Sequence, residues 1–261
     1  MATLIRRRNG PRPSPDAMTL SEHLGELRQR LIVCLVGFVI CAVATYLFYN
    51  RLLGLLDQPY CVSLHVPDSS KACDLTVLGP LDGFAIRLNV TGYGGLIIAS
   101  PIILYQLWRF ITPGLKANER RYALPFVFAT VGLFLVGALV AWITFPHALG
   151  FLHAVSGPHI NTMLTAQKYI SLIMALMAIF GLTFEFPVVL VALELAGVLT
   201  PQKLAKWRRI AIMVIVVFAA VITPSSDPFS MLALAIPMLV FYELSIVVGK
   251  LVRRNRPVAE E

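Results

Sequence analysis

The chain has 261 residues, of which 57% are hydrophobic and only 14% are charged, and its mean hydropathy is +0.77. Soluble domains average about 45–50% apolar and about 25% charged residues, so this composition indicates a chain that lies mostly in lipid. It excludes a water-soluble enzyme, a disordered chain and a disulfide-rich secreted scaffold. The net charge of +8 bears first on membrane orientation, and we expect no nucleic-acid partner.

Residues 1–18 are polar, basic and rich in proline, which predicts a disordered cytoplasmic tail. Its arginine run resembles the start of an export signal, but no small-residue cleavage site follows and the next apolar stretch is long enough to span a membrane. Thr19 and Glu22 match a helix-starting capping box. The leucines that follow at helical spacing predict a short amphipathic stretch on the membrane surface.

Hydropathy predicts an all-α bundle of six transmembrane helices within one membrane domain at 19–250, followed by a tail at 251–261. The spans are expected at about 31–49, 81–108, 122–145, 169–196, 210–223 and 229–248. The fifth covers about 21 Å, against a hydrocarbon core of about 30 Å, so it thins the bilayer or leans on its neighbours. A re-entrant pair over 210–248 is the alternative, although the sixth segment is long enough to span.

The distribution of lysine and arginine predicts the orientation. The N-terminal region, the loops at 109–121 and 203–209 and the C-terminal tail hold 18 of these residues, whereas the opposite side holds only four. By the positive-inside rule, both termini are cytoplasmic and the number of spans is even. The four residues on the outer side are Arg51, Lys71, Arg87 and Lys168.

The cysteines and histidines predict no metal site or cofactor. Cys61 and Cys73 share the first outer loop, where disulfides persist, and we expect them to be bonded, two free thiols being the alternative. The histidines lack ligand spacing, and three of them fall in one outer loop. No P-loop or G-x-S-x-G element is present, so we expect no enzymatic activity. The five histidines are His23, His65, His147, His153 and His159.

Acidic residues in apolar surroundings are the candidate functional groups. Glu185 lies inside the fourth span, where a carboxylate usually faces the bundle interior or a water-filled cavity, and Pro187 favours a kink beside it. A structural polar contact is the alternative. Glu194 and Glu243 fall near the cytoplasmic ends of their spans, where interfacial solvation is the simpler explanation.

Two cytoplasmic carboxylates are better placed to receive a ligand. Glu26 lies on the polar face of the amphipathic stretch, and Glu119 lies in a short basic loop. For Glu26 the alternative is an ion pair with Arg30, four residues later. For Glu119 the alternative is a structural role in the first turn of the third span, where a negative charge interacts favourably with the helix dipole.

Several segments match one known family in chain order. They read HLGELR at 23–28, PIILYQLW at 101–108, FITP at 110–113, NERR at 118–121, FGLTFEFP at 180–187, TP at 223–224, Asp227 and AIP at 235–237. Together they cover roughly residues 18–252, and the chain resembles the TatC family, the core subunit of the twin-arginine protein translocase. The resemblance implies a multi-pass protein of the bacterial cytoplasmic membrane that receives folded precursors whose signal peptides carry two adjacent arginines.

The resemblance also implies roles for individual residues. Glu26 and Glu119 would receive the arginine pair, with Arg28 and Phe110 beside them. Glu185 would lie within a concave, cup-like face of the bundle.

Other residues would shape the outer cap and dock partners. Pro59 would help to shape a cap on the outer side. Spans five and six would dock single-span TatA-like and TatB-like subunits near Thr223 and Asp227, although Met231 stands where some relatives have glutamine. Transport would use the proton-motive force, and the chain would contact lipid and associate with itself.

Two other functions remain open at this stage. A proton-coupled small-solute transporter would use Glu185 as its proton carrier, but such transporters commonly contain internal repeats, and the 185–187 segment has no counterpart in the first three spans. A passive membrane scaffold would bind no arginine-pair peptide at all.

Overall fold

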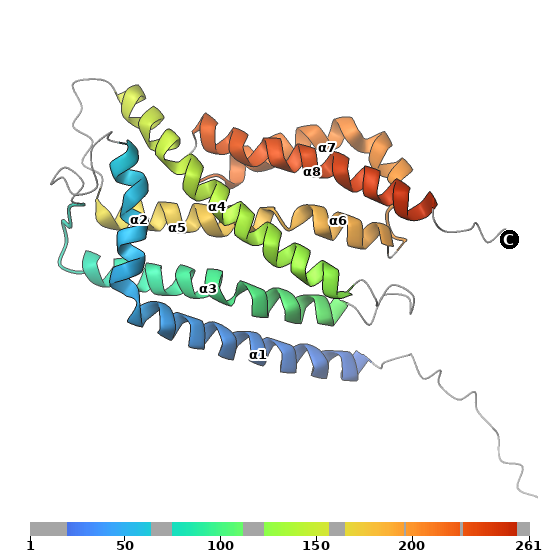
Figure 1. The fold of residues 1–261 in the computed structure, drawn as a ribbon, viewed down its shortest axis with the longest axis horizontal. Coiled ribbons are helices and arrows are strands. Elements are labelled where there is room, and N and C mark those ends of the chain that lie inside the picture. The colour runs from blue at the N-terminus through green and yellow to red at the C-terminus, as the bar shows by residue number, and fades with distance from the viewer. Residues whose placement is uncertain are drawn as a thin grey trace, which may run out of the picture.

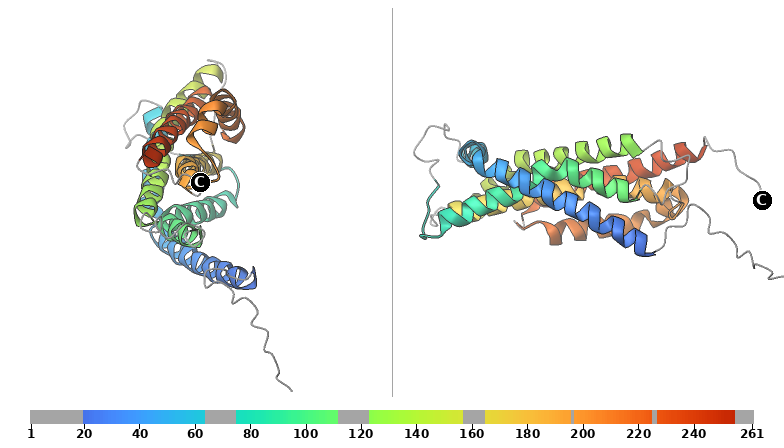
Figure 2. Two further views of the ribbon diagram at one scale, coloured as in Figure 1. Left: turned by 90° about the vertical axis from the view of Figure 1, so that its right-hand side faces the viewer. Right: turned by 90° about the horizontal axis from the view of Figure 1, so that it is seen from below.

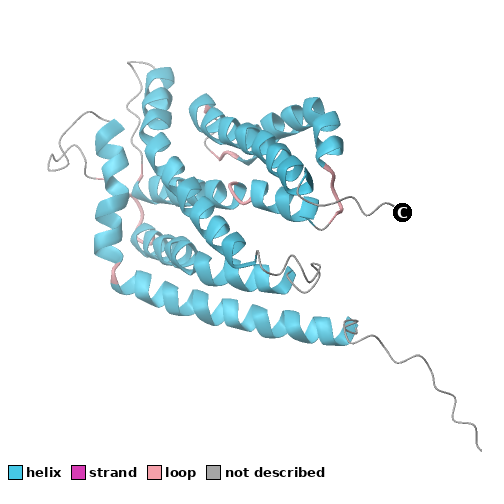
Figure 3. Ribbon diagram, turned by 45° about the vertical axis from the view of Figure 1, so that its right-hand side comes forward, coloured by secondary structure: helices cyan, strands magenta, loops and turns pink. Residues whose placement is uncertain are grey.

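The computed structural model describes residues 20–63, 75–111, 123–156, 165–195, 197–224 and 227–254. Within these ranges the chain forms eight helices and a single isolated β-bridge between Thr76 and Thr165 (Figures 1 and 3). In chain order the helices are α1 (Leu20–Leu47), α2 (Tyr49–Ser63), α3 (Asp82–Ile111), α4 (Ala123–Ser156), α5 (Ala166–Thr183), α6 (Phe186–Leu195), α7 (Pro201–Ile222) and α8 (Pro228–Arg254). The predicted all-α fold is confirmed.

Five segments of the described chain are long and apolar enough to cross a membrane. They lie in α1, in α3, in α4, in α5 and α6 together, and in α8. Two helices lie outside these segments, α2 and α7; α7 begins with a polar half that contains Lys203 and Arg209, and its apolar half starts at Ile210. This helix packs along α8 (Figure 1), as expected for a short fifth span that leans on its neighbour.

Helix α1 joins the predicted amphipathic stretch to the first span. It runs without interruption from Leu20 to Leu47, 28 residues, or about 42 Å, along one edge of the bundle (Figure 2). The amphipathic stretch and the first span therefore form one continuous helix, and the position of the stretch on the membrane surface stays a prediction. Most apolar side chains of α1 are exposed, because it packs mainly against α3.

Helix α2 was not predicted. It occupies the segment that was expected to be a loop, and Pro59 lies buried inside it. Helix α4 likewise continues through Pro146, so His147 and His153 lie on a helix and not in a loop. Pro146 is tolerated inside α4, as prolines often are in membrane helices.

Cys61 is buried in α2 and disulfide-bonded, whereas Cys34 and Cys41 are free thiols. Cys73 lies outside the described residues, as do His65 and His159. The Cys61–Cys73 pairing therefore stays a prediction.

One buried tyrosine fastens α2 to the bundle. The Tyr169 hydroxyl donates a 2.7 Å hydrogen bond to the Leu56 carbonyl oxygen, and its ring meets Tyr60 edge-on with centroids 5.4 Å apart. Tyr169→Phe removes the bond and leaves the Leu56 carbonyl without this donor. We expect the free energy of unfolding to fall by about 1 kcal/mol, measured by thermal unfolding in detergent, whereas an unchanged melting temperature would contradict this anchoring role.

Candidate functional site

The fourth span is broken beside Glu185. Helix α5 ends at Thr183 and α6 begins at Phe186. Pro187 has no N–H to donate to the Thr183 carbonyl four residues earlier, so a continuous helix would lose this bond and meet a steric clash. The chain instead turns tightly, with Glu185 N–H donating to Leu182 O at 3.1 Å and Val188 N–H donating to Glu185 O at 3.0 Å. The predicted kink is confirmed.

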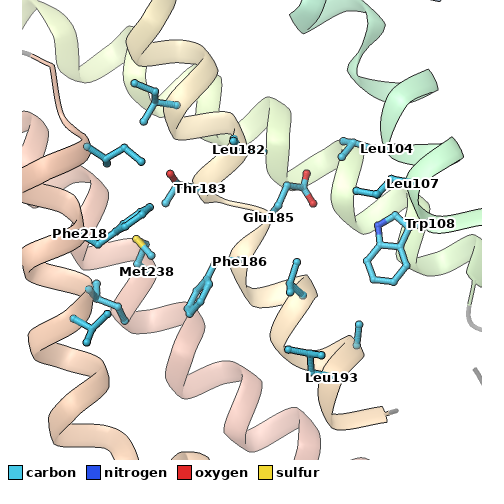
Figure 4. Close-up of a pocket in the computed structure, with 16 residues that line it drawn as sticks. Leu104, Leu107, Trp108, Leu182, Thr183, Glu185, Phe186, Leu193, Phe218 and Met238 are labelled. Carbon is cyan, nitrogen blue, oxygen red and sulfur yellow. The ribbon is translucent and has the colours of Figure 1, made fainter. Parts of the chain in front are cut away.

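This break forms one wall of a cavity of about 620 Å³. The opposite wall is the C-terminal part of α3, and α7 and α8 contribute Phe218 and Met238. Figure 4 shows the Glu185 carboxyl group directed towards Leu104 and Leu107 of α3, with the apolar side chains of α7 and α8 on the other side of the break. Among the described residues the lining is apolar and Glu185 is its one ionisable side chain, so the polar pocket expected beside the kink is not found there.

Glu185 itself is 7% exposed. Among the described residues, its Oε1 atom has no hydrogen-bond partner, and the ion pairs found there do not include it. Placing a carboxyl group in such surroundings is unfavourable unless a ligand, a partner or water satisfies it. The geometry places Glu185 where a bound segment could reach it.

Glu26 pairs with an arginine of its own helix. The Arg30 Nε donates to Glu26 Oε1 at 3.1 Å, and a second guanidinium N–H donates to the same oxygen. The ion pair with Arg30 that was the alternative for Glu26 is therefore present, and the binding role of Glu26 stays a prediction. Arg30 also donates from Nη1 to the Gln106 carbonyl oxygen at 3.4 Å. This link places Glu26 beside the α3 turn whose residues Leu104 and Leu107 line the cavity.

The other predicted members of the acidic site are placed in part. Arg28 is exposed on α1. Phe110 is half-buried in the last turn of α3, close to Trp108, whose ring lies 5.0 Å from that of Phe126 on α4. Glu119 lies outside the described residues, so its meeting with Glu26 stays a prediction.

The polar residues at the α7–α8 turn are buried and locally bonded. The Thr223 hydroxyl donates to the Ala219 carbonyl oxygen. Asp227 accepts a 2.7 Å bond from the Ser230 N–H at the start of α8. Thr223 is 3% and Asp227 1% exposed. They stabilise the two helix ends at the turn, and their role in partner docking stays a prediction.

Sequence reasoning missed two features at the opposite end of α8. Glu194, expected to be solvated, is 8% exposed and lies against Gly249 of α8. Glu243 accepts a bond from Arg208 of α7 at 2.8 Å, with a second contact of 2.6 Å between Arg208 Nε and Glu243 Oε1. Both contacts join separate helices, and no local spacing in the sequence could have shown them.

The arrangement matches that of known proteins. The family model described as Sec-independent protein translocase protein (TatC) matches residues 22–237. A protein of that name from Frankia casuarinae is 42% identical over 89% of this chain and 65% of its own length, and one from Aquifex aeolicus is 38% identical over 92% and 98%. A crystal structure of the twin arginine translocase receptor TatC in DDM has a TM-score of 0.73 at 37% identity, covering 87% of this chain and 99% of that one.

The family model covers most of the chain, the relatives exceed 30% identity, and the solved structure shares the helical arrangement. The chain therefore belongs to the TatC family of Sec-independent protein translocase proteins.

Proposed function

We propose that this chain receives twin-arginine signal peptides at its cytoplasmic face, where Glu26 and Glu119 each take one guanidinium group. As a member of the TatC family it is a component of a protein translocase. The observation that supports this site is the position of Glu26, because the bonds of Arg30 to Glu26 and to the Gln106 carbonyl oxygen place it beside the apolar cavity. An ionised carboxylate has about four acceptor positions, so an incoming arginine can share it.

The chemistry explains why arginine is preferred over lysine. A guanidinium group forms two parallel, charge-assisted hydrogen bonds to a carboxylate, whereas an ammonium group acts as a point charge. The surrounding lysines and arginines repel other basic peptides, so the site selects as well as attracts. Arg28 and Phe110 lie at the edges of the site and contact the residues that flank the arginine pair.

The cavity beside Glu185 accepts the apolar part of the signal peptide. The Arg30 link to Gln106 makes the acidic site and the α3 wall of the cavity neighbours. A peptide whose arginines bind Glu26 can therefore continue directly over Leu104 and Leu107 towards the break in the fourth span. The lining is apolar except near Glu185 and Thr183, which suits a hydrophobic segment.

The same proposal includes the surroundings of the receptor. Both termini face the cytoplasm of a bacterial cell, because the basic residues gather at that side. Single-span TatA-like and TatB-like subunits dock on α7 and α8, where Met213, Val217 and Val221 expose apolar side chains. The proton-motive force drives transport. Pro59 shapes the outer end of the bundle through its position in α2. Copies of the chain associate with one another.

A proton-coupled solute transporter remains the alternative, because Glu185 is a buried carboxyl group in a cavity. The two functions separate in proteoliposomes that contain the purified chain alone. A transporter takes up solute under a proton gradient without partners, whereas a receptor binds signal peptide and moves no small solute.

Site-specific photo-crosslinking tests the proposed site. A photoreactive residue at Gly25, where nothing lies within 4 Å of an added Cβ, is expected to label a signal peptide with its arginine pair intact. The same residue at Leu55 on α2, which is also exposed, serves as the control and is expected to remain unlabelled. Replacing both arginines by lysines should reduce labelling from Gly25 at least about tenfold. Equal labelling of the two peptides would refute the site.

A further inference from the structure

Helix α2 contains a carboxyl group that the proposed function does not use. Asp57 is half-buried, and α2 lies outside the candidate spans. Among the described residues its Oδ1 atom is buried and has no hydrogen-bond partner. A carboxylate in that position loses hydration without a compensating bond, so its ionised form is disfavoured.

Asp57 sits next to the contacts that hold α2 on the bundle. The adjacent Leu56 carbonyl accepts the Tyr169 hydroxyl, and Tyr60, one helical turn later, packs on the Tyr169 ring. A change of charge at Asp57 therefore acts directly on the interface between α2 and α5.

No cation compensates Asp57 within the described residues. On α3, Arg87 lies over the rings of Tyr46 and Tyr49, 5.0 and 4.7 Å from their centroids. Burial raises the pKa of Asp57 from its ordinary 3.8 to about 6. Burial also raises the pKa of Tyr49. The positive charge of Arg87 lowers this pKa in part, and the negative charge of Asp57 adds to the increase.

The raised pKa of Asp57 determines how the docking of α2 depends on pH. The docked helix holds a proton on Asp57 that the released helix gives up near pH 4. Protonation therefore stabilises docking fully below about pH 4, and this stabilisation is lost as the pH rises through about 6.

We propose that α2 is a pH-sensitive cap, which docks tightly on α5 when Asp57 is neutral and loosens when Asp57 ionises. This goes beyond the signal-peptide role. In the proposed orientation the cap faces the outer compartment, which the proton-motive force acidifies, so an energised membrane favours the docked cap.

Other titratable or charged groups lie on the elements that pack against α2, and a test must separate them from Asp57. The two histidines of α4 are the main competitors, because histidine changes charge between about pH 5 and 8. They include Tyr46 on α1, Tyr49, Arg51 and Tyr60 on α2, Asp82 and Arg87 on α3, His147 and His153 on α4, and Lys168 and Tyr169 on α5, which meets α2 through Tyr169.

Hydrogen–deuterium exchange of the α2 amides tests the proposal in the full-length chain in lipid nanodiscs. Rates at pH 5.5 and 7.5 are corrected for the intrinsic rate of chemical exchange, and peptides from α7, which packs against α8 and away from α2, serve as an internal reference. The opening equilibrium of α2 is expected to rise about fourfold between these pH values. In Asp57→Asn, which mimics the neutral acid, α2 should exchange more slowly than wild type at both pH values and show no pH dependence.

Two further variants complete the design. Asp57→Glu keeps a titratable carboxyl group and should retain the pH dependence, and the double variant His147→Gln/His153→Gln should retain it as well. The proposal is overturned if wild-type α2 exchange does not change with pH, if the change persists in Asp57→Asn, or if removal of the histidines abolishes it. Because no signal peptide takes part, a negative result leaves the proposed receptor function standing.

Discussion

Replacing Glu26 and Glu119 together by glutamine is expected to lower the affinity for a twin-arginine signal peptide by at least about 100-fold. Each carboxylate offers a charge-assisted hydrogen bond worth about 1.5–3 kcal/mol, and two such losses exceed the roughly 2.7 kcal/mol that corresponds to 100-fold. Each single variant should cost about tenfold or more. Titration of a fluorescent signal peptide against the chain in nanodiscs measures these affinities.

Two variants show whether the effect belongs to binding. Glu243 also pairs with an arginine, Arg208, on the polar part of α7, so Glu243→Gln removes a comparable acid and should leave the affinity unchanged. Arg30→Gln removes the link from α1 to Gln106 but keeps the Glu26 carboxylate. If Arg30→Gln weakens binding as much as the double variant does, Glu26 acts by holding α1 against α3, and the proposed contact with the peptide is wrong.

Features set by local chemistry could be read from the sequence. The apolar runs indicated the spans, including the short one that became α7. The spacing of Glu26 and Arg30 predicted their ion pair, since residues four apart lie on one helix face. Pro187 predicted the break after Thr183 because a proline leaves the preceding turn without a donor.

Features that depend on contacts between distant segments could not be read in this way. Helix α2 contains a proline and is less apolar than the spans, so its sequence did not indicate a helix. It is stabilised by burial of Leu56 and Pro59 against the bundle. The burial of Glu194 arises because α8 offers a glycine, Gly249, at the contact. The cavity likewise exists only where α3, α7 and α8 surround the broken span. Packing between distant segments determines each of these features, and the hydrophobic periodicity of the sequence does not predict such packing.

Gly137→Ala is expected to destabilise the chain by about 3 kcal/mol, because α4 and α5 touch through the backbone at this position. An added Cβ would stand 2.6 Å from the Phe180 carbonyl oxygen and 2.9 Å from Cγ of Phe184. Neither atom is the end of a flexible side chain, so α5 itself must move. That movement would displace the end of α5 from which Glu185 enters the cavity.

Gly132 provides the matched control on the same helix. Nothing lies within 4 Å of a Cβ added there, and Ala is a better helix former than Gly by up to about 1 kcal/mol. Gly132→Ala should therefore leave the melting temperature unchanged or raise it, while Gly137→Ala lowers it by several degrees in the same detergent. Equal melting temperatures for the two variants would show that α4 and α5 do not meet at Gly137, and the position of the Glu185 wall would then need to be revised, because it depends on that contact.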